Sequence, residues 1–227
     1  MLCAGSYVIA AALIDMDGVL LDSEQMHSTA FGEVLRPFGV DVDYSTIAGM
    51  STVAVFKDLS RRGLVPTDLV ESLSAAKRTA AREYASRYGV RLIPGALECV
   101  KALANRMPVA LCTSASPGTI RLMVRAGIDT SLFSAVISAE DVTNAKPSPE
   151  IYLVASSRLG LKPRNCVVIE DSVNGVEAGI EAGCNVIGVG PLVREVVSEY
   201  QLAGVPALLS HVDATNDIPT AVTELGG

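Results

Sequence analysis

Short apolar runs alternate with helical segments between residues 96 and 209, and this alternation constrains the fold more than any other feature of the sequence. Each run has the length of a strand, and the segment that follows it has apolar residues at helical spacing. The predicted strands span residues 109–113, 135–138, 167–169, 186–189 and 206–209, and the predicted helices span 96–106, 118–126, 150–159, 175–182 and 193–200. Strands that each lead into a helix favour an α/β fold, a Rossmann-like doubly wound parallel sheet.

The first 90 residues add one strand and then change character. Residues 8–14 are a continuous apolar run, as expected for a central parallel strand that is covered on both faces. Residues 23–88 contain no clear strand, and their apolar residues recur at helical spacing. Residues 23–90 also have eight basic and eight acidic side chains, so the net charge of −7 belongs to the remainder. We therefore predict a Rossmann-like core of residues 1–22 and 89–227, with an all-helical domain inserted at 23–88.

The composition excludes several classes of partner. The chain has 227 residues, of which 49% are hydrophobic and 19% charged, a balance typical of a folded globular protein. A net charge of −7 without a basic cluster disfavours nucleic acid and anionic membranes, and no apolar run is long enough to span a bilayer. The five cysteines form no C-x-x-C pair and lie mostly among apolar neighbours, which predicts free thiols. We therefore expect a cytoplasmic protein that binds neither nucleic acid nor membrane.

Polar residues directly follow several of the predicted strands. In a doubly wound sheet the ligand crevice lies outside the carboxyl ends of the strands, so these residues should meet there. The strand-end residues are Asp15 and Asp17, Thr113 and Ser114, Lys146 ahead of a proline, and Glu170 with Asp171. The sequence therefore predicts one polar site that is assembled from distant segments of the chain.

The paired carboxylates carry the chemistry of this predicted site. Asp15 and Asp17 can share one substrate, and repulsion between them favours one anion and one protonated group, as a nucleophile and a general acid require. Turn or helix-cap roles would explain the pair equally well if it stood alone. However, Glu170 and Asp171 are expected at the same edge, and four clustered carboxylates need a cation. An all-oxygen set selects a hard ion, and we predict Mg²⁺.

Two further residues could act on a phosphate. Thr113 could hold a phosphoryl oxygen with its hydroxyl and with the backbone N–H of Ser114, although a threonine at this place could also cap the next helix. Lys146 could neutralise the carboxylates and a phosphoryl group, although it could also be an exposed loop lysine. These two positions therefore leave a functional and a structural interpretation open.

The combination of these motifs resembles a known superfamily. The motifs are DMDGVLLDSE at residues 15–24, Thr113, KPSPE at 146–150, and EDS at 170–172 followed by Gly175, Ala178 and Gly179. In this order they resemble the haloacid dehalogenase-like hydrolases, in particular the branch with a helical cap inserted after the first motif. The resemblance covers nearly the whole chain. It implies that residues 23–88 are this cap.

The resemblance implies a Mg²⁺-dependent phosphatase that acts on a small phosphorylated metabolite, such as a sugar phosphate or phosphoglycolate. Asp15 would attack phosphorus to form an aspartyl-phosphate, and Asp17 would protonate the leaving oxygen and then deprotonate water. The carboxylates of Asp15 and Asp171, the backbone carbonyl of Asp17, and Glu170 directly or through water would hold the metal. Thr113 and Lys146 would hold the phosphoryl oxygens. Asp17 disfavours dehalogenation, because family members that displace halide lack this second aspartate.

The cap also resembles that of β-phosphoglucomutase, which passes the phosphoryl group to a sugar instead of water. His27 stands where the mutases have a histidine that couples cap closure to acid–base work, although it could also be a histidine on a helix surface. Residues 48–52 resemble the mutase substrate loop, with Gly49, Ser51 and Thr52 as expected substrate contacts. Ala48 and Thr52 replace the two basic residues that grip the second phosphate of the mutase substrate, which favours a phosphatase.

Other basic residues of the cap could restore such a grip. The candidates are Lys57, Arg61, Arg62 and Lys77, which we interpret as solvated helix charges. A third hypothesis, a non-catalytic ligand-binding module, predicts the loss of at least one motif residue. All of the motif residues are present.

Overall fold

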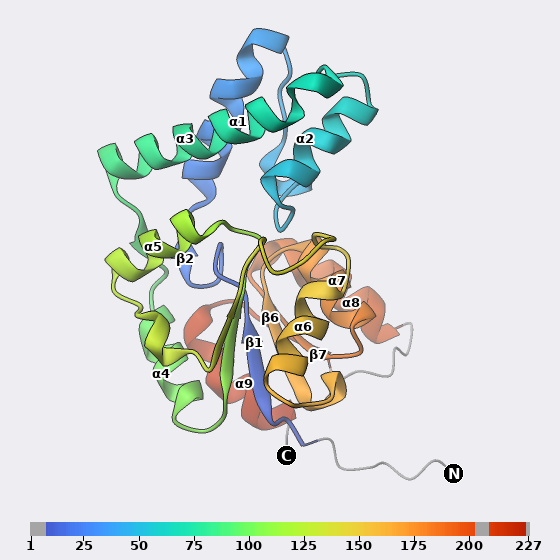
Figure 1. Cartoon of the computed structure of the whole chain (residues 1–227). Helices are drawn as coiled ribbons and strands as arrows, with labels where there is room; N and C mark the ends of the chain where they lie inside the picture. The colour runs from blue at the N-terminus through green and yellow to red at the C-terminus, as the bar shows by residue number, and fades with distance from the viewer. Residues whose placement is uncertain (1–7, 203–208, 226–227) are drawn as a thin grey trace.

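A six-stranded parallel sheet forms the centre of the molecule (Figure 1). The computed structural model describes residues 8–202 and 209–225. The strand order is β5-β4-β1-β6-β7-β8, and every neighbouring pair is parallel. The strands are β1 (Ala11–Ile14), β4 (Val109–Cys112), β5 (Ala135–Ile137), β6 (Cys166–Glu170), β7 (Asn185–Val189) and β8 (Leu209–Val212). The reversal of strand order beside β1 places a ligand crevice at the carboxyl end of that strand.

Helices cover both faces of the sheet, as Figure 1 shows. Successive residues of β1 point to opposite faces, so Ile14 packs in one hydrophobic cluster and Leu13 in the other. The first cluster includes residues of α4 (Ala96–Ala104), α5 (Pro117–Ala126) and α9 (Ile218–Leu225), and the second includes residues of α6 (Glu150–Arg158), α7 (Val173–Glu181) and α8 (Arg194–Leu202). The predicted doubly wound α/β fold is therefore confirmed.

The remaining helices come from the segment between β1 and β4. They are α1 (Glu24–Leu35), α2 (Thr52–Arg61) and α3 (Val70–Tyr88), and they pack on one another around Phe31, Phe56 and Leu59. The chain enters and leaves this segment through two neighbouring strands, because β2 (Leu21–Asp22) pairs antiparallel with β3 (Arg91–Leu92). These features support the predicted insertion, and its boundaries at residues 23 and 88 stay a prediction.

Several details differ from the sequence-based prediction. The first strand is shorter than the apolar run, and α9 was not predicted although Ile218, Ala221 and Val222 have helical spacing and are buried. The predicted last strand at 206–209 lies almost entirely outside the described residues, and β8 begins at its final residue. Short 3₁₀ turns occur at Arg36–Phe38, Tyr44–Thr46, Thr67–Leu69, Thr130–Leu132, Pro163–Asn165, Pro191–Val193 and Thr215–Asp217. Within residues 8–202 and 209–225, no helix combines the length and the apolar character that crossing a membrane requires.

Candidate active site

A large cleft lies between the carboxyl edge of the sheet and helices α1 to α3. Its volume is about 920 Å³, and Asp15, Asp17, Ser114, Lys146 and Asp171 all line it. These residues come from the ends of β1, β4 and β6 and from the loop before α6. The predicted convergence of strand ends is therefore observed, and it follows from the hydrogen-bonded neighbours of β1, which are β4 and β6.

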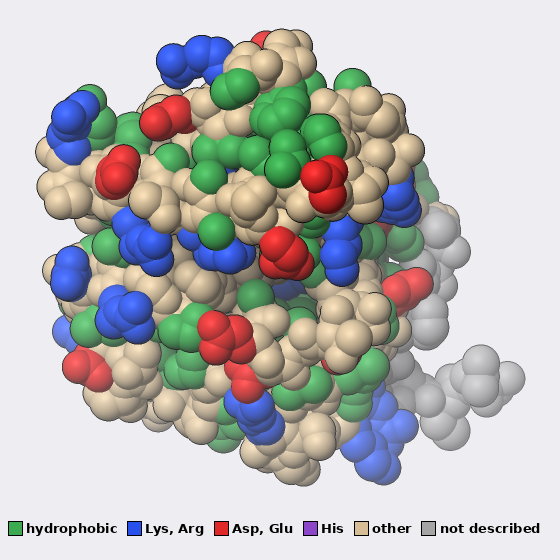
Figure 2. Space-filling model, turned by 45° about the horizontal axis from the view of Figure 1, so that its top comes forward, with side chains coloured by type: hydrophobic (Ala, Val, Ile, Leu, Met, Phe, Trp, Pro, Cys, Tyr) green, Lys and Arg blue, Asp and Glu red, His purple; other side chains and the backbone are tan. Residues whose placement is uncertain are grey.

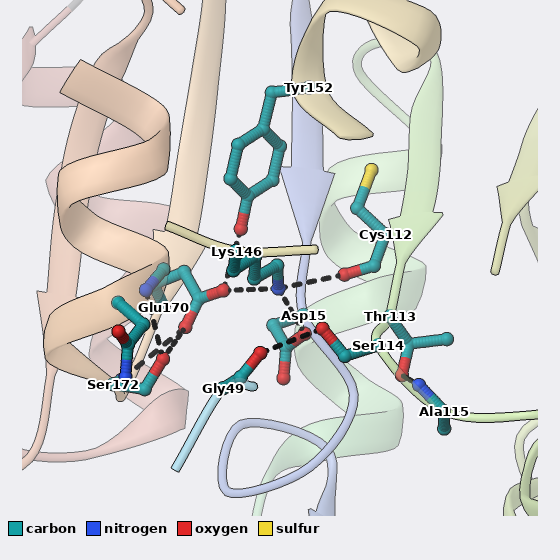
Figure 3. Close-up of polar contacts among 12 residues, drawn as sticks. Asp15, Gly49, Cys112, Thr113, Ser114, Ala115, Lys146, Tyr152, Glu170 and Ser172 are labelled. Carbon is teal, nitrogen blue, oxygen red and sulfur yellow. Dashed lines mark hydrogen bonds and ion pairs between the residues drawn. The ribbon is translucent and has the colours of Figure 1, made fainter. Parts of the chain in front are cut away.

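Lys146 lies at the centre of the carboxylates, as Figure 3 shows. Its Nζ atom donates to Asp15 Oδ1 at 2.6 Å, to Glu170 Oε1 at 2.5 Å and to the Cys112 carbonyl at 3.2 Å. The side chain is fully buried. Burial lowers the pKa of Lys146, but attraction to Asp15 and Glu170 outweighs this effect and holds the pKa above its ordinary value. The lysine is therefore a permanent cation beside Asp15 and not an exposed loop residue.

Besides Lys146, three further donors hold Glu170. The Tyr152 hydroxyl donates to Oε1 at 2.6 Å, and the Ser172 hydroxyl and backbone N–H donate to Oε2 at 2.9 and 3.3 Å. Gly175 leaves room for this carboxylate, since a Cβ at that position would lie 1.9 Å from Glu170 Cδ. This effect of Tyr152, Ser172 and Gly175 does not require contact with a substrate. Together they fix the direction of a buried carboxylate.

Three carboxylates form a group that fits a divalent cation. Asp15, Glu170 and Asp171 each offer an oxygen, and these oxygens lie within 4.8 Å of one another. Gly18 permits this approach, because a Cβ there would lie 1.7 Å from Asp171 Oδ2. The Asp17 carboxylate is outside the group, and the expected contribution of its backbone carbonyl stays a prediction.

The pKa values of this group also indicate a missing positive charge. Burial raises the pKa of Asp15 to about 8, against the opposing effect of Lys146 and with a smaller contribution from Glu170. Burial and repulsion from Glu170 and Asp15 raise the pKa of Asp171 well above its ordinary value. One lysine therefore does not compensate three clustered carboxylates, and a bound cation would lower both pKa values. An all-carboxylate donor set suits Mg²⁺.

Asp17 has its own set of partners on helices α1 and α3. The Ser23 hydroxyl donates to Asp17 Oδ1 at 2.5 Å, and His27 Nε2 lies 3.3 Å from the same oxygen. Lys77 Nζ lies 2.7 Å from His27 Nδ1. An ammonium can only donate, so His27 Nδ1 accepts and His27 Nε2–H donates to Asp17. This tautomer makes His27 neutral and leaves Asp17 as the acceptor.

The pKa values follow from these contacts. Burial raises the pKa of Asp17, but attraction and hydrogen bonding from His27 and Ser23 outweigh it, so that pKa lies below its ordinary value. Burial and the Lys77 charge lower the pKa of His27, and burial lowers the pKa of Lys77 to about 8. The expected division, with the anion at Asp15 and the proton at Asp17, therefore depends on a cation beside Asp15, which would favour the Asp15 anion.

The loop at residues 48–52 touches the core at two hydrogen bonds. Ser114 Oγ donates to the Gly49 carbonyl at 2.7 Å, and Asn174 Nδ2 donates to the Ala48 carbonyl at 2.8 Å. Gly49 has a φ of 79°, and a Cβ there would lie 2.3 Å from Ser172 Oγ. Only glycine therefore allows this loop to close against the core. Ser51 caps α2 through the Ala54 N–H, and Thr52 lines the cleft, so all three predicted loop residues border it.

Comparison with known proteins assigns the family. The haloacid dehalogenase-like hydrolase family matches residues 9–183. The chain belongs to this family. A Drosophila melanogaster protein named "Probable pseudouridine-5'-phosphatase" is 32% identical over 191 residues, which cover 80% of this chain and 81% of the relative. Fructose-1-phosphate phosphatase YqaB of Escherichia coli K12 is 28% identical over 187 residues, covering 79% and 96% of the two chains.

A solved structure of another protein has the same fold. The crystal structure of β-phosphoglucomutase from Clostridium difficile superposes with a TM-score of 0.77 at 22% identity, and the match covers 96% of this hydrolase and 97% of the mutase. At this identity the likeness concerns the fold alone. The family model therefore confirms the family that was expected from the sequence, and the solved structure confirms the fold.

The structure places two residues of this hydrolase differently from what the sequence suggested. Thr113 is fully buried and does not line the cleft, and its hydroxyl accepts from the Ala115 N–H at 3.0 Å. Ser114 lines the cleft instead, as Figure 3 shows, because β4 ends at Cys112 and the next side chains alternate in direction. The Ser114 hydroxyl donates to the Gly49 carbonyl, and the expected contact of Thr113 with a phosphoryl group stays a prediction.

Lys77 is the second of these residues, because it is not a solvated helix charge. It is only 4% exposed and contacts His27, and its Nζ lies 4.4 Å from the centre of the Phe31 ring. Val70, Ser74, Lys77, Ala81 and Ala85 are all buried, at the spacing of one helix face. This face contains a serine and a lysine, and alanines lie on the other faces too, so the sequence pattern alone did not identify it. Arg61 and Arg62 are exposed and pair with Asp58, which agrees with their interpretation as surface charges.

Proposed function

We propose that this hydrolase is a Mg²⁺-dependent phosphatase of small phosphorylated metabolites, with Asp15 as the covalent nucleophile. The observation that carries the proposal is the position of Asp15, which faces the cleft with Lys146 at 2.6 Å and two further carboxylates beside it. A nucleophilic carboxylate needs a fixed direction and a neutralised approach path for an anionic ester, and this arrangement supplies both. The names of two relatives, both phosphatases of small phosphate esters, also support it.

The carboxylates of Asp15 and Asp171, the backbone carbonyl of Asp17, and Glu170 directly or through water would hold Mg²⁺. The bound cation would neutralise the phosphoryl oxygens and the charge that develops on them. Protein groups would supply the remaining contacts to the phosphoryl group. Lys146 would neutralise the phosphoryl group by its charge, and the segment after β4, with the Thr113 hydroxyl and the Ser114 backbone N–H, would hold phosphoryl oxygens.

The reaction would occur in two displacements. Asp15 Oδ attacks phosphorus, the ester P–O bond breaks, and Asp17 gives a proton to the leaving oxygen, which departs as an alcohol. The ionised Asp17 then takes a proton from a water molecule as that water attacks the aspartyl-phosphate. The products are inorganic phosphate and free Asp15. His27 and Ser23 hold the Asp17 carboxylate in one position for both steps, and the negative charge of a bound ester would raise the pKa of Asp17 for the first step.

An assay of phosphate release from p-nitrophenyl phosphate and a panel of phosphorylated metabolites tests this proposal. We expect release that requires Mg²⁺, is abolished by EDTA, and is absent in Asp15→Asn with an unchanged circular dichroism spectrum. An Asp15→Asn variant with near-normal Mg²⁺-dependent turnover would contradict the nucleophile assignment. Since the four described cysteines are buried free thiols, we retain a reducing cytoplasm as the proposed location.

A phosphosugar mutase is the second candidate, and one observation favours it. His27 contacts the Asp17 carboxylate and Lys77 contacts His27, and both residues belong to the proposed cap. The acid–base role of Asp17 would therefore depend on the position of the cap. Incubation with β-glucose 1-phosphate and a trace of β-glucose 1,6-bisphosphate separates the two activities. Inorganic phosphate release identifies a phosphatase, and glucose 6-phosphate formation without it identifies a mutase.

A further inference from the structure

The wall of the cleft that helices α2 and α3 form is strongly basic. Within residues 23–88, all of which the structure describes, Glu24 is the single acidic residue that lines the cleft. The basic residues of this segment that line it are Lys57, Arg61, Lys77, Arg78 and Arg82. Figure 2 shows Lys and Arg side chains along the boundary between the helical part and the core. The segment is nearly neutral overall, so its positive charges are concentrated on the face toward the cleft.

The spacing of these charges costs stability. Lys57 and Arg61 are four residues apart on α2, and Arg78 and Arg82 are four residues apart on α3. Like charges at this spacing lie on the same helix face and destabilise a helix by roughly 0.2–0.5 kcal/mol per pair. The two helices also pack against each other. A basic face of this kind is therefore better explained by binding than by folding.

Four of these basic residues have no acidic partner within the described part of the chain, and one of the four, Lys77, contacts His27 instead. Lys57 and Arg78 make no hydrogen bond or ion pair there, and Arg82 donates only to the Thr79 hydroxyl. Arg61, in contrast, pairs with Asp58. Lys57, Arg78 and Arg82 are thus free to bind an anion in the cleft.

We propose that the leaving group of the substrate carries a second anionic group, a carboxylate or a phosphate, which Lys57 and Arg78 bind. This inference rests on the proposed phosphatase function, since it concerns the part of the ester that remains after phosphoryl transfer. The cleft of about 920 Å³ is near the upper end of small-molecule sites, which leaves room for such a group between Asp15 and the helices. Although Ala48 and Thr52 replace the two basic residues of the mutase loop, the wall of the cleft still carries positive charge on α2 and α3.

General attraction of the phosphoryl group itself is the alternative role for these charges. It would act on every phosphate ester in proportion to the charge of that ester, and added salt would weaken it for all of them. Specific binding of a second anion would act only on substrates that have one. Matched substrate pairs assayed at high salt therefore separate the two roles.

The test compares kcat/KM at high salt for two such pairs. The first pair is 2-phosphoglycolate and 2-hydroxyethyl phosphate, which differ by a carboxylate, and the second is glucose 1,6-bisphosphate and glucose 1-phosphate, which differ by a phosphate. We expect the doubly anionic member of at least one pair to be preferred by about tenfold or more, equivalent to about 1.4 kcal/mol. The pair that responds identifies the second anion. Equal kcat/KM within both pairs would overturn the proposal.

Variants then locate the binding residues. Arg78→Gln and Lys57→Gln should each lower kcat/KM about tenfold for the preferred doubly anionic substrate. The loss should be less than about twofold for the matched phosphate ester that lacks the second anion. Arg87→Gln is the control, because Arg87 is an exposed residue of α3 that does not line the cleft. Equal losses on both members of a pair would overturn the proposal in favour of general attraction. Hydrolysis of p-nitrophenyl phosphate that depends on Asp15 would show that the phosphatase function stands even if this inference fails.

Discussion

The Lys146 ammonium lies 2.6 Å from Asp15 Oδ1 although 131 positions separate the two residues in the chain. Both groups are almost completely inaccessible to water, and the same ammonium also contacts Glu170. A buried carboxylate without a counter-charge is costly, so this contact belongs both to the fold and to the proposed chemistry.

Replacing Lys146 by methionine should therefore affect stability as well as activity. Removal of one partner of a buried ion pair typically costs about 3–5 kcal/mol, because the other charge remains buried. We expect a loss of this size in the free energy of unfolding by urea, together with loss of phosphate release. Arg158→Met is the control, since its ion pair with Asp141 is half exposed and should contribute below about 1 kcal/mol. Equal stability losses in the two variants would contradict the central position of Lys146.

The Tyr152 hydroxyl tests whether Glu170 helps to hold the cation. Tyr152→Phe removes the 2.6 Å hydrogen bond to Glu170 Oε1 and leaves the ring in place. We expect Mg²⁺ affinity, measured by calorimetry, to fall about 10- to 100-fold, as is usual when a partner of a ligating carboxylate is lost. Tyr84→Phe is the control, because Tyr84 lies on α3, away from the carboxylates. Unchanged Mg²⁺ affinity in Tyr152→Phe would remove Glu170 from the proposed metal site.

Gly49 tests whether closure of the loop against the core matters for turnover. Gly49→Ala would place a methyl group 2.3 Å from Ser172 Oγ, at a φ of 79°. Gly63→Ala is a matched control, because Gly63 has a φ of 73° and nothing lies within 4 Å of the added Cβ. Both variants carry backbone strain of about 1–2 kcal/mol. We expect only Gly49→Ala to raise KM for p-nitrophenyl phosphate, and similar KM values for the two would contradict a role for closure.

Thr113 and Ser114 separate two assignments of the phosphoryl-contacting hydroxyl. Thr113→Val should lower kcat by about 10²-fold, the usual cost of losing one donor to developing negative charge. This variant also leaves the Ala115 N–H without its acceptor and should cost about 1–3 kcal/mol of stability. Ser114→Ala keeps the backbone N–H and should cost less activity per folded molecule. Both kcat values, normalised to the folded fraction, check this. A larger loss of kcat in Ser114→Ala would contradict the assignment of the contact to Thr113.

The sequence alone was sufficient to predict the sheet and the convergence of Asp15, Lys146, Glu170 and Asp171. Parallel strands that alternate with helices place their carboxyl ends on one edge, so residues at strand ends meet whatever the details of packing. Ser114 was predicted among these residues, but which of Thr113 and Ser114 faces the cleft was not predictable in this way. An error of one residue in the end of β4 turns every following side chain to the opposite direction.

The burial of Lys77 was also missed, and for a different physical reason. Alanine residues lie all around α3, so its hydrophobic pattern does not identify one buried face. The partners of Lys77 are His27 and the Phe31 ring, both on α1 and about 50 positions away. Only the packing of α1 against α3 brings these groups together.

The most direct test of the account is the detection of a phosphoryl group on Asp15. The enzyme is mixed with Mg²⁺ and p-nitrophenyl phosphate, quenched in acid during turnover and digested for mass spectrometry. The account predicts a phosphorylated peptide that contains Asp15, and no such peptide in Asp15→Asn. Turnover with the phosphoryl group on another residue, or an unmodified Asp15 peptide under conditions that trap a known aspartyl-phosphate enzyme, would contradict it.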